Sequence, residues 1–246
     1  MNLPRTIAFA TAATVAVTAT LGCGFISAAG NLAGNISTLS DFADKITKSE
    51  HATFQATYKL QDGTPVTVAQ KPPNSATIGD KGMYLSTMDA FYLCSKDSGN
   101  WVCQKSPAQG ETNTAGDPAL AATVAGGGFI SAPLAVAVLT AALVVPGAKV
   151  DKTQETIAGQ KSTCAKVSNL AQAQQGTESA KVSDFTVCVT DAGVLARFAG
   201  TGTDGTKANI ELTQYSPTVD DSVFKPPAGA QINDVGQLSA PSPAAS

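Results

Sequence analysis

The sequence predicts an α+β fold, in which a curved antiparallel sheet forms a half-barrel closed by a few helices. Three observations indicate this class: segments of alternating apolar and polar residues follow one another through tight turns, a helix precedes them, and an uncharged helical stretch interrupts them. A single sheet of this kind leaves an apolar face that helices must cover. The pattern alone leaves open whether sheet and helices enclose an apolar cavity or a filled core.

The first predicted helix begins at Ser37, a residue type that caps helices, and ends near Glu50. Its apolar side chains recur at positions i, i+3, i+4 and i+7, which places them on one face: Leu39, Phe42, Ala43 and Ile46.

About ten strands follow, recognised by alternation and by turn residues between them. Those before the middle of the chain span residues 53–60, 65–71, 76–78 and 83–86, together with a hairpin around residues 97–100. Those after it span residues 153–157, 162–167, 185–190, 194–199 and 208–215. The last three strands, joined by short turns, give the clearest local pattern.

The mid-chain stretch, residues 118–148, contains no charged side chain. Asp117-Pro118 is typical of a helix start, the triple glycine at 126–128 of a break, and Ser131 of a second cap. Pro146-Gly147 ends the second helix, which is apolar nearly all round and so must be buried in protein, in lipid or against a ligand. Three interpretations remain: a membrane span, a core helix, and a helix pair that closes a cavity for an acyl chain.

The composition excludes some functions. The net charge of −3 and the isoelectric point near 5.1 provide no basic surface, so we expect no nucleic-acid partner. Charged residues make up only 14 % of the chain, while small residues are abundant, a composition that suits an exported bacterial protein.

The first residues form a targeting segment. Arg5 supplies positive charge, and an apolar run over residues 7–21 ends directly before Cys23. Leu21-Gly22-Cys23 is similar to a lipobox, the signal for thioether lipidation of a cysteine, although Thr20 stands where leucine is usual. The alternative is an ordinary secretory peptide cleaved after Ala29.

These features give four predicted segments. Residues 1–22 are a lipoprotein signal peptide, 23–36 a tether, 37–229 the half-barrel domain, and 230–246 a disordered tail rich in alanine, proline and serine.

Four cysteines remain after Cys23, an even number that indicates disulfides in an oxidising compartment. Four cysteines allow three pairings. A hairpin centred between Ser98 and Gly99 places Cys94 opposite Cys103, which favours that bond and leaves Cys164 with Cys188. Loop-closure entropy assigns the two bonds about 2.7 and 3.5 kcal/mol.

No catalytic or metal-binding constellation is recognisable in the sequence. His51 is the only histidine, and no nucleophile elbow, zinc motif or phosphate-binding loop is present. Asp220-Asp221 is interpreted as a pair of solvated carboxylates. We therefore expect no enzyme activity, no metal and no cofactor.

The order of elements resembles the LolA-like lipoprotein carrier fold, in particular exported bacterial lipoproteins of the LppX and LprG type. The residues that carry the resemblance are Leu21-Gly22-Cys23, the helix-to-strand entry over residues 39–58, the mid-chain apolar helices, and the closing segment 215–229 with its Phe-Lys-Pro-Pro-Ala-Gly ending. The two expected disulfides are an addition to that pattern. The resemblance implies a hydrophobic cavity between sheet and helices that carries an acylated lipid or a lipidated protein chain.

The resulting hypothesis is a lipid-anchored protein of the cell envelope, exported to the outer face of the cell membrane or a periplasm-like space. It binds or shuttles an amphiphile, with an envelope protein as a possible further partner. The expected cavity lining is the following set: Leu120, Val124, Phe129, Ile130, Leu134, Val138, Leu139 and Leu143. The alternative is a non-enzymatic surface interaction or regulatory lipoprotein with a filled core.

Overall fold

One open sheet of twelve strands organises the structure, a computed structural model that describes residues 37, 40–108, 129–143, 145, 147–170 and 182–235. The strand order is β12-β6-β5-β4-β3-β2-β1-β11-β10-β9-β8-β7. The strands are β1 (Phe54–Leu60), β2 (Pro65–Lys71), β3 (Asn74–Ile78), β4 (Gly82–Ser86), β5 (Ala90–Asp97), β6 (Asn100–Pro107), β7 (Lys149–Ile157), β8 (Gln160–Ser168), β9 (Val182–Thr190), β10 (Leu195–Gly202), β11 (Lys207–Ser216) and β12 (Gln231–Asp234). The expected curved, largely antiparallel sheet is therefore confirmed.

The end of the chain differs from the prediction. The stretch from residue 230, expected to be disordered, begins with β12, which pairs with β6 in parallel. Lys105 Nζ lies 3.0 Å from Asp234 Oδ2 across this pair. The sheet therefore has twelve strands where about ten were expected, and one of its pairs is parallel. Residues 236–246 lie outside the described residues.

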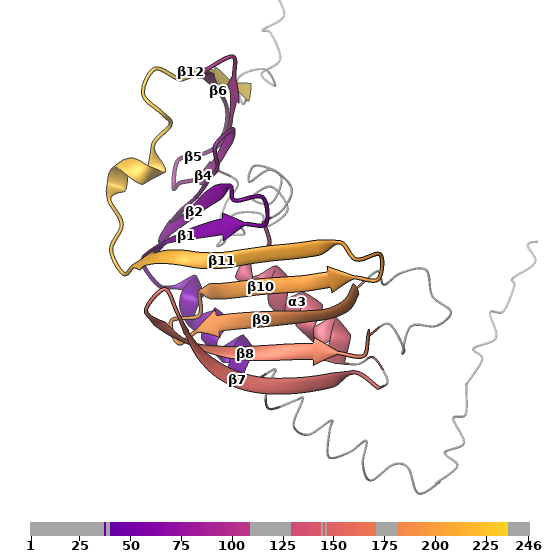
Figure 1. The fold of residues 1–246 in the computed structure, drawn as a ribbon. Coiled ribbons are helices and arrows are strands. Elements are labelled where there is room, and N and C mark those ends of the chain that lie inside the picture. The colour runs from indigo at the N-terminus through magenta and orange to yellow at the C-terminus, as the bar shows by residue number, and fades with distance from the viewer. Residues whose placement is uncertain are drawn as a thin grey trace, which may run out of the picture.

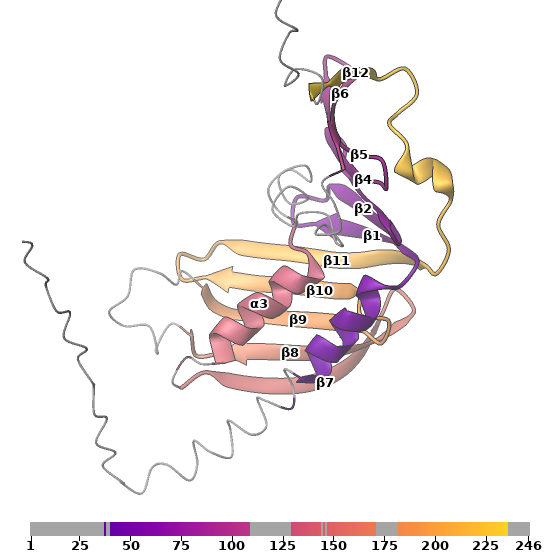
Figure 2. The ribbon, with the colours of Figure 1, turned by 180° about the vertical axis from the view of Figure 1, so that it is seen from behind.

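Two helices lie on the same face of the sheet, which we call the inner face. They are the N-terminal helix (residues 40–50) and α3 (Ala132–Leu143), and both lie over the half formed by β7–β11 (Figures 1 and 2). The sheet bends near β1, so that β2–β6 and β12 stand away from this covered half (Figure 2). The helices thus close one half of the sheet's inner face.

The main hydrophobic core lies between these helices and the inner face. Phe42 and Ile46 of the N-terminal helix are buried in it, as expected, whereas Ala43 is exposed.

Polar contacts hold the same helix at the sheet edge: Lys45 Nζ lies 2.6 Å from Thr163 Oγ1, and Lys152 Nζ lies 2.8 Å from Asp41 Oδ2. The hydrogen bond from Lys152 lowers the pKa of Asp41, which keeps this carboxylate ionised.

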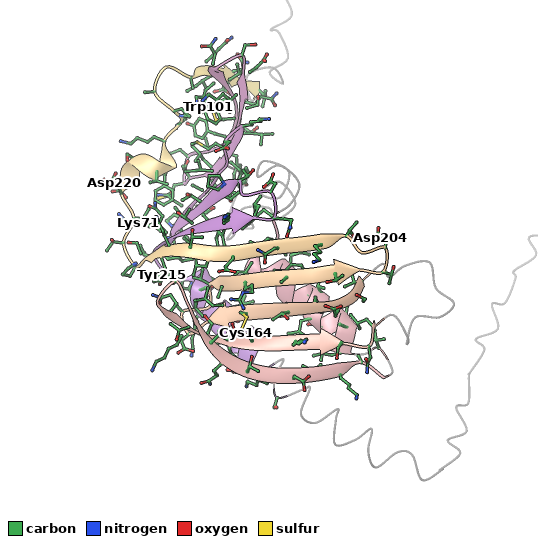
Figure 3. The ribbon with its side chains drawn as sticks, in the orientation of Figure 1. Lys71, Trp101, Cys164, Asp204, Tyr215 and Asp220 are labelled. Atoms are coloured by element: carbon green, nitrogen blue, oxygen red, sulfur yellow. A yellow bond between two sulfur atoms is a disulfide. The ribbon has the colours of Figure 1, made fainter. Side chains whose placement is uncertain are left out.

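A second, smaller core lies on the opposite, outer face of β2–β6. The chain after β11 crosses this face through the short helix η2 (Asp221–Phe224), whose Phe224 is buried against the sheet. Asp220, which lies near Lys71 (Figure 3), caps η2 by accepting a hydrogen bond from the backbone N–H of Ser222. Asp221 pairs with Lys71, with 2.6 Å between Oδ1 and Nζ. The two neighbouring aspartates therefore have structural partners.

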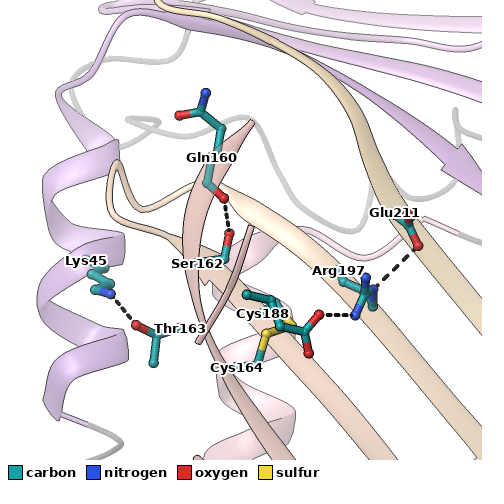
Figure 4. Close-up of a disulfide and its surroundings, with 9 residues drawn as sticks. Lys45, Gln160, Ser162, Thr163, Cys164, Cys188, Arg197 and Glu211 are labelled. Atoms are coloured by element: carbon teal, nitrogen blue, oxygen red, sulfur yellow. Dashed lines mark hydrogen bonds and ion pairs between the residues drawn. A yellow bond between two sulfur atoms is a disulfide. The ribbon is translucent and has the colours of Figure 1, made fainter. Parts of the chain in front are cut away.

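Both predicted disulfides are present, and each joins two adjacent strands. Cys94 is bonded to Cys103 across β5 and β6, and Cys164 to Cys188 across β8 and β9. The second disulfide lies on the outer face, where Arg197 lies beside it (Figure 4) and pairs with Glu155. Since both bonds link strand to strand, neither fixes the distance between the sheet and the helices.

Helix α3 does not have the uniform burial expected from its apolar sequence. Its inward residues Ala135, Leu139 and Ala142 are buried over β9 and β10. The outward stripe is exposed and comprises Pro133, Leu134, Ala137, Thr140 and Ala141. Among the described helices, none is long and apolar enough to cross a membrane. Among the described elements the sheet packs against one side of this 12-residue helix, so its other face is exposed.

Candidate functional site: an apolar cavity at the start of helix α3

A cavity of about 130 Å³ lies where the covered half of the sheet meets the uncovered half. The inner faces of β1–β4 form its floor, the first residues of α3 and the end of the N-terminal helix lie above it, and the β9–β10 turn closes one side. Its lining includes six large apolar or aromatic side chains: Phe54, Tyr58, Val68, Phe129, Val194 and Leu195.

The strand register explains how residues far apart in sequence share this floor. Side chains of successive strands lie on one face when their residues are paired, because a strand alternates its side chains with a period of two. Ala56 pairs with Val68, Val68 with Thr77, and Thr77 with Tyr84. This row crosses β1–β4 and runs along the cavity floor.

Aromatic packing forms the wall nearest to α3. The rings of Tyr58 and Phe129 meet edge to face, with centroids 5.4 Å apart. Tyr58 is only 3 % exposed, and burial raises the pKa of its phenol above the ordinary value. The phenol therefore stays protonated and uncharged at neutral pH.

Few polar groups reach the cavity. Gln70 Nε2 donates to the backbone carbonyls of Ser49, Glu50 and Ala52, at 2.6, 3.0 and 3.1 Å, and so satisfies the end of the N-terminal helix. Ser131 Oγ is buried and has no hydrogen-bond partner among the described residues, although the backbone carbonyl of Ser131 starts α3 by accepting from Ala135 N–H. Glu50 is the one charged residue in the described lining.

The β9–β10 turn brings the N-terminal helix unusually close to the sheet. Gly193, which lines the cavity, adopts a φ of +82°, and a Cβ atom at this position would collide with the backbone carbonyl of Lys45. Thr190 N–H and Val194 C=O close the turn at 2.8 Å. Because glycine has no Cβ, the end of the N-terminal helix lies this close to the turn beside the cavity.

The residues predicted to line a cavity are distributed differently in the structure. Phe129 lines it. Leu139 is fully buried in the main core, Ile130, Val138 and Leu143 are half-buried against that core, and Leu134 is 40 % exposed. Helix α3 lies over β9 and β10, so its inward side chains fill the core there, and only its first turn reaches the cavity. Leu120, Val124, Cys23 and the predicted break at 126–128 lie outside the described residues.

The histidine and the four described cysteines lie outside the cavity lining. His51 is exposed and is not part of the cavity lining. On the outer face, the carboxylate of Glu155 lies near the sulfurs of Cys164 and Cys188. Those sulfurs are joined in a disulfide, whereas metal ligation requires thiolates. The chemistry that the cavity itself offers is the removal of apolar groups from water.

Comparisons with known proteins find similarity in structure alone. No family model matches the chain, and no curated protein matches it. Similar solved structures include an uncharacterized conserved protein from Thermus thermophilus, with a TM-score of 0.44, 8 % identity, and coverage of 80 % of this chain and 99 % of that one. They also include the Mycobacterium tuberculosis lipoprotein LppX, with a TM-score of 0.38, 11 % identity, and coverage of 75 % and 97 %. A lipoprotein of the LppX type, the group named in the resemblance stated from the sequence, is thus among the similar solved structures.

Proposed function

We propose that this chain is a lipid-anchored envelope protein that binds an amphiphile by enclosing part of its acyl chain in the cavity at the start of α3. The observation that supports the proposal is the lining itself, in which aromatic and aliphatic side chains surround a space with few polar groups. Ligand pockets commonly combine such a lining with a few placed hydrogen-bonding groups.

The size of the cavity limits what it encloses at once. The cavity volume near 130 Å³ is close to that of a dry engineered cavity of ~150 Å³ that binds benzene. The space therefore holds a segment of about six carbons. Burying about six methylene groups contributes roughly 5 kcal/mol. Typical pockets for larger ligands measure about 300–1,000 Å³, so a full-length acyl chain requires the helices to move away from the sheet.

The covalent structure permits this movement. Both disulfides join neighbouring strands. The helices are held by packing, by hydrogen bonds from Lys45 and Gln70, and by the Lys152–Asp41 pair. The helices therefore separate from the sheet without breaking a covalent bond, whereas the sheet keeps its shape.

Export and anchoring complete the proposal. The predicted signal peptide takes the chain across the membrane, and lipidation at Cys23 retains it at the outer face or in a periplasm-like space. A protein held at a bilayer and able to shield an acyl chain is suited to extracting or shuttling lipids or lipidated proteins. The proposed activity is binding without chemical conversion of the ligand.

A cavity-filling substitution tests the site. Val68→Phe replaces an isopropyl group on the cavity floor by an aromatic ring. We expect it to weaken binding of a fluorescent 16-carbon fatty-acid probe by tenfold or more, because the ring occupies the space of the chain. Thr67→Phe is the matched control, since the neighbouring residue of β2 directs its side chain to the other face of the sheet. The measurement is a fluorescence titration of each purified protein.

Equal affinity of the two variants for the probe would contradict the assignment of this cavity as the binding site. Circular dichroism and thermal unfolding of both variants establish that the comparison is made between folded proteins.

The small volume also favours a second candidate, a non-enzymatic interaction lipoprotein whose core is essentially filled. It predicts that neither protein binds the probe and that substitutions at the cavity floor change stability alone.

A further inference from the structure

The outward face of α3 is an uncharged surface with no described element packed on it. Its exposed residues recur at positions 133, 137 and 140–141, opposite the buried residues 135, 139 and 142. Leu134, 40 % exposed, is one of the few large apolar side chains at the described surface. A face of this kind, on a helix without a single charged residue, is unusual for a surface exposed to water.

The neighbouring helix provides the contrast. The N-terminal helix lies on the same side of the sheet (Figure 2), yet its outward residues include Asp44 and Lys48, both exposed. The two helices therefore share a face of the molecule but have different outward surfaces, polar on one and apolar on the other.

The described helix nearest in sequence to the proposed anchor lies on this same face. The start of the N-terminal helix is held at the sheet edge by the Asp41–Lys152 pair, and the helix precedes the sheet in sequence. Fourteen peptide units separate Cys23 from Ser37, a length of at most roughly 50 Å. A lipid on Cys23 would thus hold the helical face within reach of the bilayer.

The cavity adjoins the uncharged face of α3. Ser131, Ala132 and Pro133 line the cavity, and Pro133 also belongs to the exposed stripe. A surface pressed against the outward side of α3 would therefore lie beside the start of the cavity.

We propose that the outward face of α3 docks onto the lipid bilayer and places the cavity next to the membrane. This inference rests on the proposed lipid anchor. Docking of this kind lets an acyl chain pass between bilayer and cavity with little exposure to water. Because α3 has no cationic residue, its attraction to the membrane is apolar and does not depend on anionic lipid.

The small apolar area of α3 predicts weak affinity on its own. The anchor compensates for this, since it raises the effective concentration of the helix at the bilayer. We therefore expect docking in the lipidated protein and weak binding in a chain in which Cys23 is replaced by serine.

The experiment uses the full lipidated chain with one added cysteine that bears the environment-sensitive fluorophore NBD. The other cysteines are lipidated or disulfide-bonded, so the added thiol is the reactive one. Ala137→Cys reports on the outward face of α3, Thr47→Cys on the N-terminal helix, and Gln214→Cys on the outer face of the sheet. Vesicles of phosphatidylcholine, with and without phosphatidylglycerol, carry a nitroxide quencher in the acyl region.

We expect quenching and a blue shift at Ala137, a smaller response at Thr47 and none at Gln214, with equal results in both lipid compositions. Equal responses at all three positions, or none, would overturn the proposal. A blue shift at Ala137 that increases with protein concentration in the absence of vesicles would indicate that a second copy of the chain covers the outward face of α3. That result would also overturn the proposal.

Mass spectrometry of each preparation distinguishes a failure of the docking proposal from a failure of the proposed function. Absence of the lipid mass on Cys23 would reject the anchor and, with it, the docking. Loss of probe binding by the cavity, with Ala137 still quenched, would reject the ligand site and leave the docking intact.

Discussion

Replacing Gly193 by alanine is expected to lower the free energy of unfolding by about 2–5 kcal/mol, the largest effect of a single methyl group that we predict. Two costs add at this position. The φ of +82° is unfavourable for a residue with a side chain, and the new Cβ would collide with the backbone carbonyl of Lys45. A backbone atom gives way only if the end of the N-terminal helix moves away from the sheet. Urea unfolding followed by circular dichroism measures the loss.

Gly205→Ala is the matched control. Its φ of +81° is almost the same, but a Cβ there meets no atom within 4 Å, so only the conformational cost of about 1–2 kcal/mol applies. Similar losses at both positions would show that the close approach of helix and turn is absent. Because Gly193 also lines the cavity, we expect its substitution, and not that of Gly205, to change the affinity for the fatty-acid probe.

Phe42→Ala is expected to lower the free energy of unfolding by about 3–5 kcal/mol, since it removes a fully buried aromatic ring from the main core. Phe42 is the most deeply buried described side chain of the N-terminal helix, so the loss concerns the element that covers one side of the cavity. Thermal and urea unfolding of the variant give the magnitude, and hydrogen exchange of residues 40–50 shows whether the helix opens first.

The comparison for this prediction is Thr47→Ala on the exposed side of the same helix. Its hydroxyl donates only to the carbonyl of Ala43, and we expect a change within about 0.5 kcal/mol. A loss below about 1 kcal/mol for Phe42→Ala would contradict the burial of the helix against the sheet.

Much of the sheet was predictable because its strands are local patterns. The alternation of Phe54, Ala56, Tyr58 and Leu60 predicted β1, and the Asp-Ser-Gly-Asn turn predicted both the β5–β6 hairpin and the bond between Cys94 and Cys103. In contrast, β12 has four residues and no buried side chain, so its sequence carries no periodic pattern. Its position depends on pairing with an edge strand about 130 residues earlier in the chain, which only the tertiary structure supplies.

The site was less predictable than the fold. Eight large apolar residues of the uncharged mid-chain stretch were expected to line the cavity, yet of those eight that the structure describes only Phe129 does. Phe54, Tyr58 and Val68 lie on the floor, and their alternation is that of any buried strand face. No local signal distinguishes a strand residue that faces a cavity from one that faces a filled core, because the difference depends on where α3 crosses the sheet.

The burial of helix α3 was also only partly predictable from the sequence. Its apolar sequence correctly indicated a burial partner, but its outward face is exposed, and this face is the one we assign to the bilayer. The sequence pattern identifies which residues avoid water and leaves open whether protein, ligand or lipid takes the place of water.

The most direct test of the central proposal is native mass spectrometry of the chain with Cys23 replaced by serine, produced from residue 23 in an oxidising compartment. Spectra are recorded before and after extraction with organic solvent, together with those of Val68→Phe. The account predicts an adduct of lipid mass that extraction removes and that is reduced in the variant, with both disulfides intact. A clean ligand-free mass for the unsubstituted cavity, with both disulfides formed and no uptake of added lipid, would contradict the binding function and favour the interaction module.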